Sequence, residues 1–321
     1  MTMPKIKRAQ TLSLFLFLAA NAGLLYARTT LAQTALAQAK RTDTPPIQAA
    51  SSNEHAAPST ASLRAEPIPD ARTLLAQVQV EQRKMSAELE NYTYKEVTVT
   101  RLLDKHGRVS KTFSETDDVF FVNGHEIDRM VARNGHPLSE KEQKKEQERV
   151  NKAVLLAVKT PRNQTSDPND VSISQLLNLM TLSHPRRVMV ADRPTLVFDF
   201  VGNPHAHTHG AIEGASKKLT GSLWIDEKDR NVERLLADFD ANFHMGWGIF
   251  ALDKGSSFDF VQQRVAPDIW LPSKATMHIV AHAFGFIGYR ANVVVTDSNY
   301  QVFHVAVSAE TVTRQSSLTK K

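Results

Sequence analysis

Cysteine is absent from the 321 residues of this chain. Its absence excludes disulfide bonds, a thiolate nucleophile, cysteine-ligated metal centres and the lipid-bearing N-terminal cysteine of a mature lipoprotein. An exported domain of this composition must therefore be stable through its hydrophobic core alone. The chain is long enough to build such a core.

Long apolar runs are also scarce. Residues 12–25 form one uncharged apolar run, and its 14 residues are too few to span a bilayer as an ordinary transmembrane helix. A basic start precedes this run, and a small-residue cleavage site, Ala35-Leu36-Ala37, follows it. The pattern predicts a secretory signal peptide over residues 1–37, and hence a periplasmic protein that is not an integral membrane protein after cleavage. Two earlier cleavage sites and an uncleaved membrane anchor are alternatives.

The excess of positive charge is largely confined to this leader. The full chain carries a formal net charge of +5, and residues 1–37 contribute four basic residues and no acidic one. The remaining chain therefore carries only +1. A nearly neutral protein has no general electrostatic reason to bind nucleic acid, so we expect no nucleic-acid partner.

Composition divides the rest of the chain into three parts. Residues 38–69 are rich in Ala, Ser, Thr and Pro and have few large apolar side chains, so we expect a disordered tether. Residues 70–310 have the composition of one folded domain. Residues 311–321 are polar and short, and we expect them to form a flexible tail.

Motifs for catalysis are missing. The chain has no Gly-x-Ser-x-Gly elbow and no glycine-rich phosphate loop, and His125-Glu126 lacks the second histidine of a metalloprotease motif. The acidic pairs Asp117-Asp118 and Asp238/Asp240 lie in or beside expected strands, where surface charge is the simplest interpretation. We therefore predict no catalytic residue, no cofactor and no enzymatic activity.

Histidines recur in one loop. His205, His207 and His209 alternate with small residues, and imidazoles spaced in this way can converge on zinc, nickel or copper. No carboxylate lies close by until Glu213, so the pattern lacks the surroundings of a fixed metal centre. We predict a solvated loop and no metal site. A metal-dependent hydrolase built on this loop is the weaker alternative.

The second half of the chain is dominated by apolar residues at every second position, which is the pattern of strands with one buried face. The clearest example flanks a charged turn at residues 227–231 and comprises Leu219, Leu223, Ile225, Leu235, Ala237 and Phe239. Asn123-Gly124 is a strong hairpin signal. We expect about eleven antiparallel strands.

Helices are expected at three places. Asp70 can cap a helix whose apolar stripe is Leu74, Val78, Met85 and Leu89. A capping box begins at Ser139, before a charged helix that we expect to lie near the mouth of the sheet. A short helix over residues 171–182 completes the set, and residues 203–218 are expected to form a loop.

One strand indicates a use for such a sheet. In residues 269–283, the side chains on one face of the expected strand are apolar and mostly small. Small side chains on a concave face leave volume for a ligand. Aromatic and aliphatic residues of neighbouring strands extend this lining. We predict a hydrophobic-ligand site formed by Leu223, Ile225, Leu235, Phe258, Phe260, Ala275, Met277, Ile279 and Ala281. An ordinary core filled by the helices is the alternative.

Two segments resemble a known superfamily. They are Gly221-x-Leu223-Trp224-Ile225-Asp226 followed by Val232-x-Arg234-Leu235, and Trp270-Leu271-Pro272 entering a long strand. Both resemble the periplasmic lipoprotein-carrier superfamily, which includes LolA-like and RseB-like domains. The resemblance implies an α+β fold, a half-open antiparallel β-barrel of about eleven strands with helices over the concave face. It also implies that this face holds acyl chains. An insertion at residues 128–170 and the histidine loop depart from that pattern.

These observations predict a non-catalytic periplasmic binding or carrier protein. Its partner would be a hydrophobic ligand or a lipoprotein, held in the barrel concavity. A module for envelope protein–protein interaction or stress sensing, with the same fold and a closed core, is the alternative.

Overall fold

A computed structural model describes residues 67–162, 172–245 and 250–303. The expected signal peptide, nearly all of the expected tether, and the C-terminal tail lie outside the described residues. Within the described part of the chain, no helix has the length and apolar character needed to cross a membrane.

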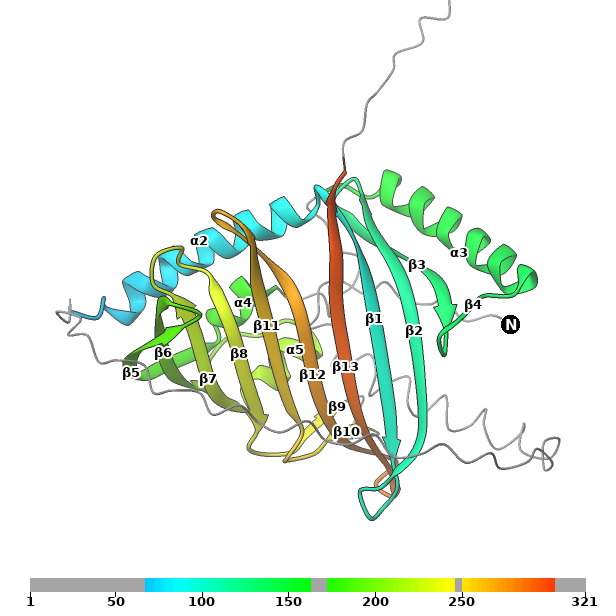
Figure 1. The fold of residues 1–321 in the computed structure, drawn as a ribbon. Helices are drawn as coiled ribbons and strands as arrows, with labels where there is room; N and C mark the ends of the chain where they lie inside the picture. The colour runs from blue at the N-terminus through cyan, green and yellow to red at the C-terminus, as the bar shows by residue number, and fades with distance from the viewer. Residues whose placement is uncertain (1–66, 163–171, 246–249, 304–321) are drawn as a thin grey trace, which may run out of the picture.

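The described strands form one antiparallel sheet with the order β4-β3-β2-β1-β13-β12-β11-β8-β7-β6-β5 (Figure 1). Two short strands, β9 and β10, extend it locally because β10 pairs with β12. The sheet is open, so the predicted half-open antiparallel barrel is confirmed. The strands are β1 (Tyr92–Leu103), β2 (Val109–Val122), β3 (His125–Arg133), β4 (His136–Pro137), β5 (Met180–Val190), β6 (Arg193–Gly202), β7 (Leu219–Asp226), β8 (Val232–Phe239), β9 (Phe243–Met245), β10 (Phe250–Leu252), β11 (Ser257–Ala266), β12 (Ile269–Ala283) and β13 (Ile287–Val302).

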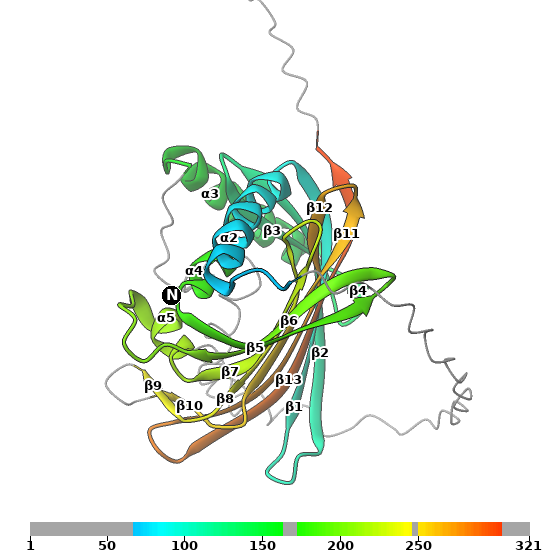
Figure 2. The ribbon, with the colours of Figure 1, turned by 90° about the vertical axis from the view of Figure 1, so that its left-hand side faces the viewer.

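Two helices pack over the concave face of this sheet, as Figure 2 shows for α2 (Ala71–Leu89) and α4 (Ile173–Leu177). Asp70 begins α2, because its side chain accepts a hydrogen bond from the backbone N–H of Thr73. The predicted stripe of Leu74, Val78, Met85 and Leu89 is buried against the sheet. The helix therefore follows the amphipathic pattern of the sequence.

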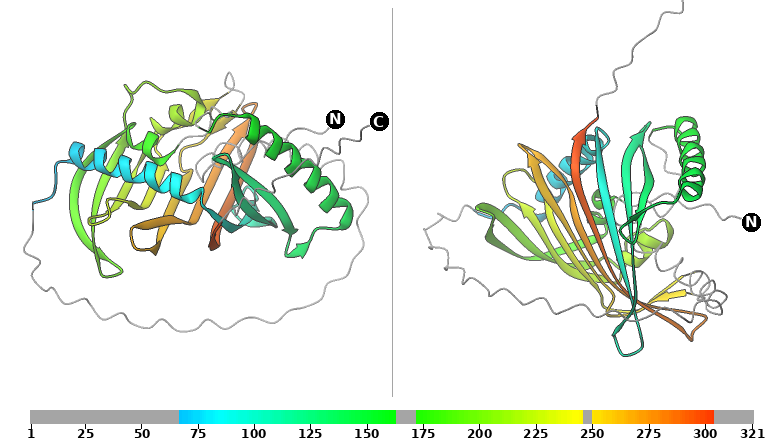
Figure 3. Two further views of the ribbon diagram at one scale, coloured as in Figure 1. Left: turned by 90° about the horizontal axis from the view of Figure 1, so that it is seen from above. Right: turned by 45° about the vertical axis from the view of Figure 1, so that its right-hand side comes forward.

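The helix that follows Ser139 takes a different place. α3 (Glu140–Lys159) packs Val150 and Ala157 against Ile127, which lies opposite Phe120 in the β2–β3 ladder. Because successive side chains alternate between faces, this is the face of β2 and β3 that points away from the concavity. The expectation that this helix lies near the mouth is therefore wrong, and Figure 3 shows it beside β3.

α3 also protects an edge of the sheet. The Glu146 carboxylate accepts a hydrogen bond from the backbone N–H of Met130 at 2.8 Å, and Arg149 donates to the backbone carbonyl of Asp128. Both backbone groups belong to β3, which has only the two-residue β4 on its outer side. These contacts use hydrogen-bonding groups that another strand could otherwise pair with.

The opposite edge strand, β5, is interrupted instead. Its pairing with β6 shifts register between Ser183 and Arg186, where His184 has a φ of 48° and Pro185 lacks an N–H. The sequence placed a helix over part of this strand, whereas α4 ends at Leu177. A second difference is α5 (Gly210–Ser216), a short helix within the segment expected to be a loop.

The hairpin at the centre of the resemblance depends on one glycine. A Cβ atom at Gly221 would lie 1.9 Å from the backbone oxygen of Leu236, so β7 and β8 approach too closely here for any larger residue. Two residues further along β7, Leu223 lies directly opposite Leu235.

Candidate functional site

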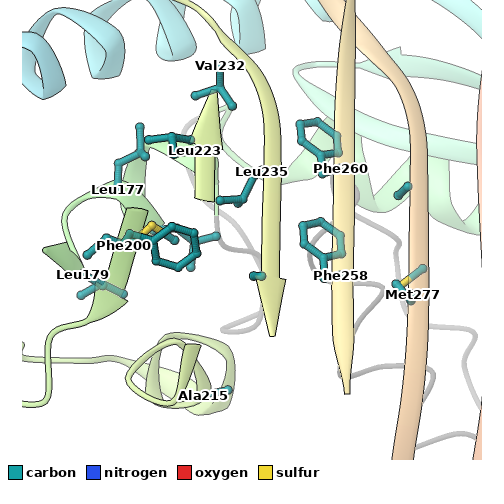
Figure 4. Close-up of a cluster of buried hydrophobic side chains, with 14 of the residues drawn as sticks. Leu177, Leu179, Phe200, Ala215, Leu223, Val232, Leu235, Phe258, Phe260 and Met277 are labelled. Carbon is teal, nitrogen blue, oxygen red and sulfur yellow. The ribbon is translucent and has the colours of Figure 1, made fainter. Parts of the chain in front are cut away.

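The nine residues predicted to line a hydrophobic site belong to one buried cluster on the concave face. Figure 4 shows Leu223, Leu235, Phe258, Phe260 and Met277 within it. Each of the nine is at most 7 % exposed. Register explains their grouping: Phe260 lies opposite Leu235 on one side and opposite Ala275 on the other. We call the part of the concave face that carries these nine residues the apolar half. The rings of Phe258 and Phe260 are stacked within it, with centroids 6.2 Å apart.

Helices cover these side chains. Leu74 and Val78 of α2, together with Leu176 and Leu177 of α4, belong to the same cluster as the nine lining residues. A ligand can reach the apolar half only if these helices move. Whether the nine residues contact a ligand therefore stays a prediction.

Beyond this cluster, the concave face also carries buried acidic side chains. Glu96 of β1 lies directly opposite Asp117 of β2 and directly opposite Asp297 of β13. Their exposed fractions are 9 %, 1 % and 5 %, respectively. We call these three residues the carboxylate cluster. The interpretation of Asp117 as surface charge is wrong, whereas Asp118, of opposite parity, bonds exposed Arg129 at 2.9 Å.

Asp297 has an unusual environment within the carboxylate cluster. Its Oδ1 atom is buried and has no hydrogen-bond partner among the described residues. Burial and the neighbouring Glu96 carboxylate raise the pKa of Asp297 to about 8. The ionised form of Asp297 is therefore disfavoured in this environment.

Tyrosines border the carboxylate cluster. Tyr94 shares the concave face with Glu96, and its ring lies 5.0 Å from that of Tyr300. Burial, followed by the negative charges of Glu126, Asp297 and Glu96, raises the pKa of the Tyr94 hydroxyl well above its usual value. The electrostatic potential here is therefore negative.

Sequence reasoning missed this polar region for a physical reason. Every second residue of one part of β1 is polar: Tyr94, Glu96, Thr98 and Thr100. Polar residues at alternate positions normally mark the face of a strand that meets water. In the structure these alternate residues lie on the buried face of β1. A pattern along a single strand does not say which face the sheet turns inward.

A second polar contact fastens α2 to the sheet. The Gln82 side-chain amide donates hydrogen bonds to Asn231 Oδ1 at 3.0 Å and to Gln262 Oε1 at 3.4 Å, and all three residues are buried. We call this the Gln82 latch. It fixes the helix at one place on an otherwise apolar surface, where packing alone would tolerate sliding.

Two acidic side chains are buried where β7 meets the charged turn. Asp226 is fully buried and bonds Arg193 through both oxygens, while Asp229 bonds Arg264 and the indole N–H of Trp270. This network holds β6, β7 and β12 together at one end of the sheet. Its role is to fix the strands that carry the apolar half.

The histidines do not assemble into a site. His205, His207 and His209 are all exposed, and the hydrogen bonds of this loop run from backbone N–H groups: that of His205 donates to Asn203 Oδ1, and that of His209 donates to the Glu213 carboxylate. His278 bonds Asn292 and His282 bonds Asp253, each through Nδ1. Over the described residues, no three or more His, Cys, Asp or Glu side chains are arranged so that they could hold a metal ion.

Comparisons with known proteins add little to this geometry. No protein-family model matches the chain. No curated protein matches it either. Among solved structures, a DUF1329 family protein from Desulfovibrio piger ATCC 29098 aligns with 74 % of this chain and 94 % of its own, at 12 % identity and a TM-score of 0.28. A likeness at this TM-score carries no argument about the present chain.

Proposed function

We propose that this protein is an exported, non-catalytic binding or carrier protein that holds a hydrophobic ligand on the concave face of its sheet. The ligand would be an acyl chain, a lipid or the lipid-modified end of a lipoprotein. Export to the periplasm rests on the signal-peptide pattern of residues 1–37. The resemblance of residues 221–235 to lipoprotein carriers supports the same role.

The observation that carries this proposal is the construction of the apolar half. A wide apolar sheet face is covered by two helices, and one of them, α2, is a single amphipathic helix fixed by few polar contacts. Displacing α2 exposes the sheet face without unpairing any strand. Small residues beneath it, such as Ala275 and Ala291, and the adaptable Met277 suit a surface that must accept a different occupant.

Energetics limit the ligand to a long chain. Burial of each methylene group contributes about 0.8 kcal/mol, whereas association costs about 4–15 kcal/mol in lost freedom. Displacing α2 adds to this cost. A short acyl group cannot offset it, so affinity should rise about tenfold for every two methylenes added.

Two measurements test the proposal. Native mass spectrometry of protein purified without detergent should show a bound amphiphile or its uptake from a series of neutral alkyl glucosides. Fluorescence of N-phenyl-1-naphthylamine, which is uncharged at neutral pH, should rise on mixing and fall when a long-chain glucoside competes. A ligand-free mass together with no chain-length dependence would rule out the carrier role.

A second candidate function has its own supporting observation. Leu155, Leu156 and Val158 lie exposed near the end of α3, away from the concave face. Such a patch fits an interaction module whose core stays closed. A variant with all three residues changed to Ser should then lose a partner that wild-type protein retains from envelope extracts. Equal recovery with both proteins would exclude this patch as the docking surface.

A metal-dependent hydrolase receives no support from the arrangement of the described side chains. The three loop histidines are exposed, and the Glu213 carboxylate beside them accepts a hydrogen bond from the backbone N–H of His209 rather than from an imidazole.

A further inference from the structure

Three carboxylates lie side by side across three neighbouring strands. Because Glu96 is in register with both Asp117 and Asp297, the Cβ atoms of each pair are about 4.5–5.5 Å apart. Placing like charges this close in a buried region is unfavourable unless protons or a cation neutralise them. A fold that needed only a stable core would place apolar residues here.

An independent observation points to a ligand. Asp297 Oδ1 is buried and makes no hydrogen bond within the described part of the chain, although Asp297 lies on the same face as Glu96. Buried polar atoms nearly always have partners, since an orphaned one is destabilising. In the ionised carboxylate this atom is an acceptor, so the partner that would stabilise the charged form is a hydrogen-bond donor.

Aromatic rings lie beside these acceptors. Tyr94 precedes Glu96 by two residues on the same face, and the Tyr300 hydroxyl donates to the carbonyl of Pro272 at 2.7 Å, which fixes its ring next to that of Tyr94. Carboxylates combined with aromatic faces are the surroundings in which proteins bind ammonium groups.

The carboxylate cluster continues directly from the apolar half. Asp297 lies two residues from Val295 on β13, a separation of about 7 Å, and Val295 lies opposite Ala275. One helix covers both regions, because Leu74 and Val78 of α2 pack on the apolar half while Leu89 packs beside Tyr94. An amphiphile lying under α2 would meet both regions at once.

We propose that the carboxylate cluster binds the ammonium head group of an amphiphile whose alkyl chain lies on the apolar half of the concave face. This inference rests on the proposed carrier function and names its ligand class, a long-chain amine or an amine-bearing lipid. The three carboxylates supply the charge, and the Asp297 Oδ1 atom accepts a hydrogen bond from the ammonium group. Anionic head groups would be repelled.

The test compares amphiphiles that share one chain and differ in head group. Dodecylamine, dodecyltrimethylammonium, dodecyl glucoside and dodecanoate are titrated into wild-type protein below their micellar concentrations, and binding is measured by calorimetry. The cationic probes should bind about 10- to 100-fold more tightly than the glucoside, as charge-assisted contacts imply, and dodecanoate should bind more weakly. A lysolipid with an ethanolamine head group tests whether the site tolerates a phosphate next to the ammonium group. If it binds as tightly as dodecylamine, the natural ligand is a lipid; if it binds weakly, the ligand is a free amine. Both results fit the proposal.

Variants locate the effect. Asp297→Asn should weaken binding of dodecylamine about tenfold or more and leave dodecyl glucoside unchanged. Glu96→Gln provides a second variant in case the first folds poorly, which circular dichroism would show. Asp238→Asn is the matched control, because it removes the same charge from an exposed position on β8. It should change neither affinity.

The outcomes separate the two proposals. Equal binding of cationic and neutral probes, unaffected by either variant, would overturn the ammonium site and leave the carrier function standing. Absence of binding for every twelve-carbon probe would overturn both. Calcium binding that Asp297→Asn abolishes, with no preference among head groups, would also overturn the ammonium site in favour of a metal.

Discussion

The two halves of the concave face are built from the same ladder and differ in chemistry. β13 belongs to both: Val293 and Val295 pack in the apolar half, and Asp297, two residues further, joins the carboxylate cluster. In the apolar half burial favours folding, whereas in the carboxylate cluster burial opposes it. Two equally buried parts of one sheet face can therefore affect the free energy of folding in opposite directions.

The largest effect should follow from a cavity in the apolar half. Phe260→Ala removes a fully buried ring from the centre of the cluster and should lower the free energy of unfolding by about 3–5 kcal/mol. Urea denaturation measures this change. Val265→Ala, at an exposed position of the same strand, is the control and should stay within about 0.5 kcal/mol. Similar losses for both variants would show that Phe260 is not central to the core.

The carboxylate cluster should respond in the opposite direction. The raised pKa of Asp297, about 8, means that the folded state holds a proton that the unfolded chain releases near pH 4. Its contribution to stability is full below pH 4 and is lost as the pH rises to 8. Asp297→Asn should therefore raise the melting temperature by several degrees at pH 9 and change it little at pH 4.

Thermal melts from pH 4 to pH 9 measure this difference. Asp238→Asn serves as the control because its side chain is exposed. A melting-temperature difference for Asp297→Asn that does not vary with pH would show that Asp297 is already ionised in the folded protein at pH 4.

The Gln82 latch joins α2 to the sheet and should have an intermediate effect. Gln82→Ala leaves the buried oxygens of Asn231 and Gln262 without this donor, at a cost of about 1–3 kcal/mol. Looser attachment of α2 should speed uptake of N-phenyl-1-naphthylamine, measured by stopped-flow fluorescence. Arg83→Ala, at an exposed position of the same helix, should leave the rate unchanged. An unchanged rate for Gln82→Ala would show that α2 does not gate the apolar half.

The smallest effect is expected from the histidine loop, which belongs to neither half. Replacing His205, His207 and His209 by Ala removes three exposed side chains and should change stability by less than about 0.5 kcal/mol. Calorimetric titration with zinc should give the same heat for the variant and the wild type. A difference between the two would revive a metal site in this loop.

Periodicity in the sequence was sufficient to predict the sheet and α2. The alternation around Leu223, Leu235 and Ala275 identifies the buried parity, since large apolar residues on one side of a strand have few other uses. The stripe on α2 is equally direct. The same reasoning placed the nine lining residues in one cluster, although it does not decide whether helices or a ligand cover them.

The carboxylate cluster was beyond prediction because burial of polar residues depends on tertiary contacts. Asp117 follows Glu96 by 21 positions in the sequence, and Asp297 follows Asp117 by 180. Each of them alone resembles an ordinary surface acid. Only the pairing of β1 with both β2 and β13 brings them together. The position of α3 was mispredicted for a related reason, because a capping box specifies where a helix begins and not which face it covers.

The protection of both sheet edges has a consequence for the working protein. In the proposed carrier, displacement of α2 would present bare apolar surface, and an unprotected edge strand would then be able to pair with a second molecule. Glu146 and Arg149 occupy the backbone of β3, and the break at His184 and Pro185 interrupts β5. Neither edge of the described sheet therefore offers a long uninterrupted strand for another molecule to pair with.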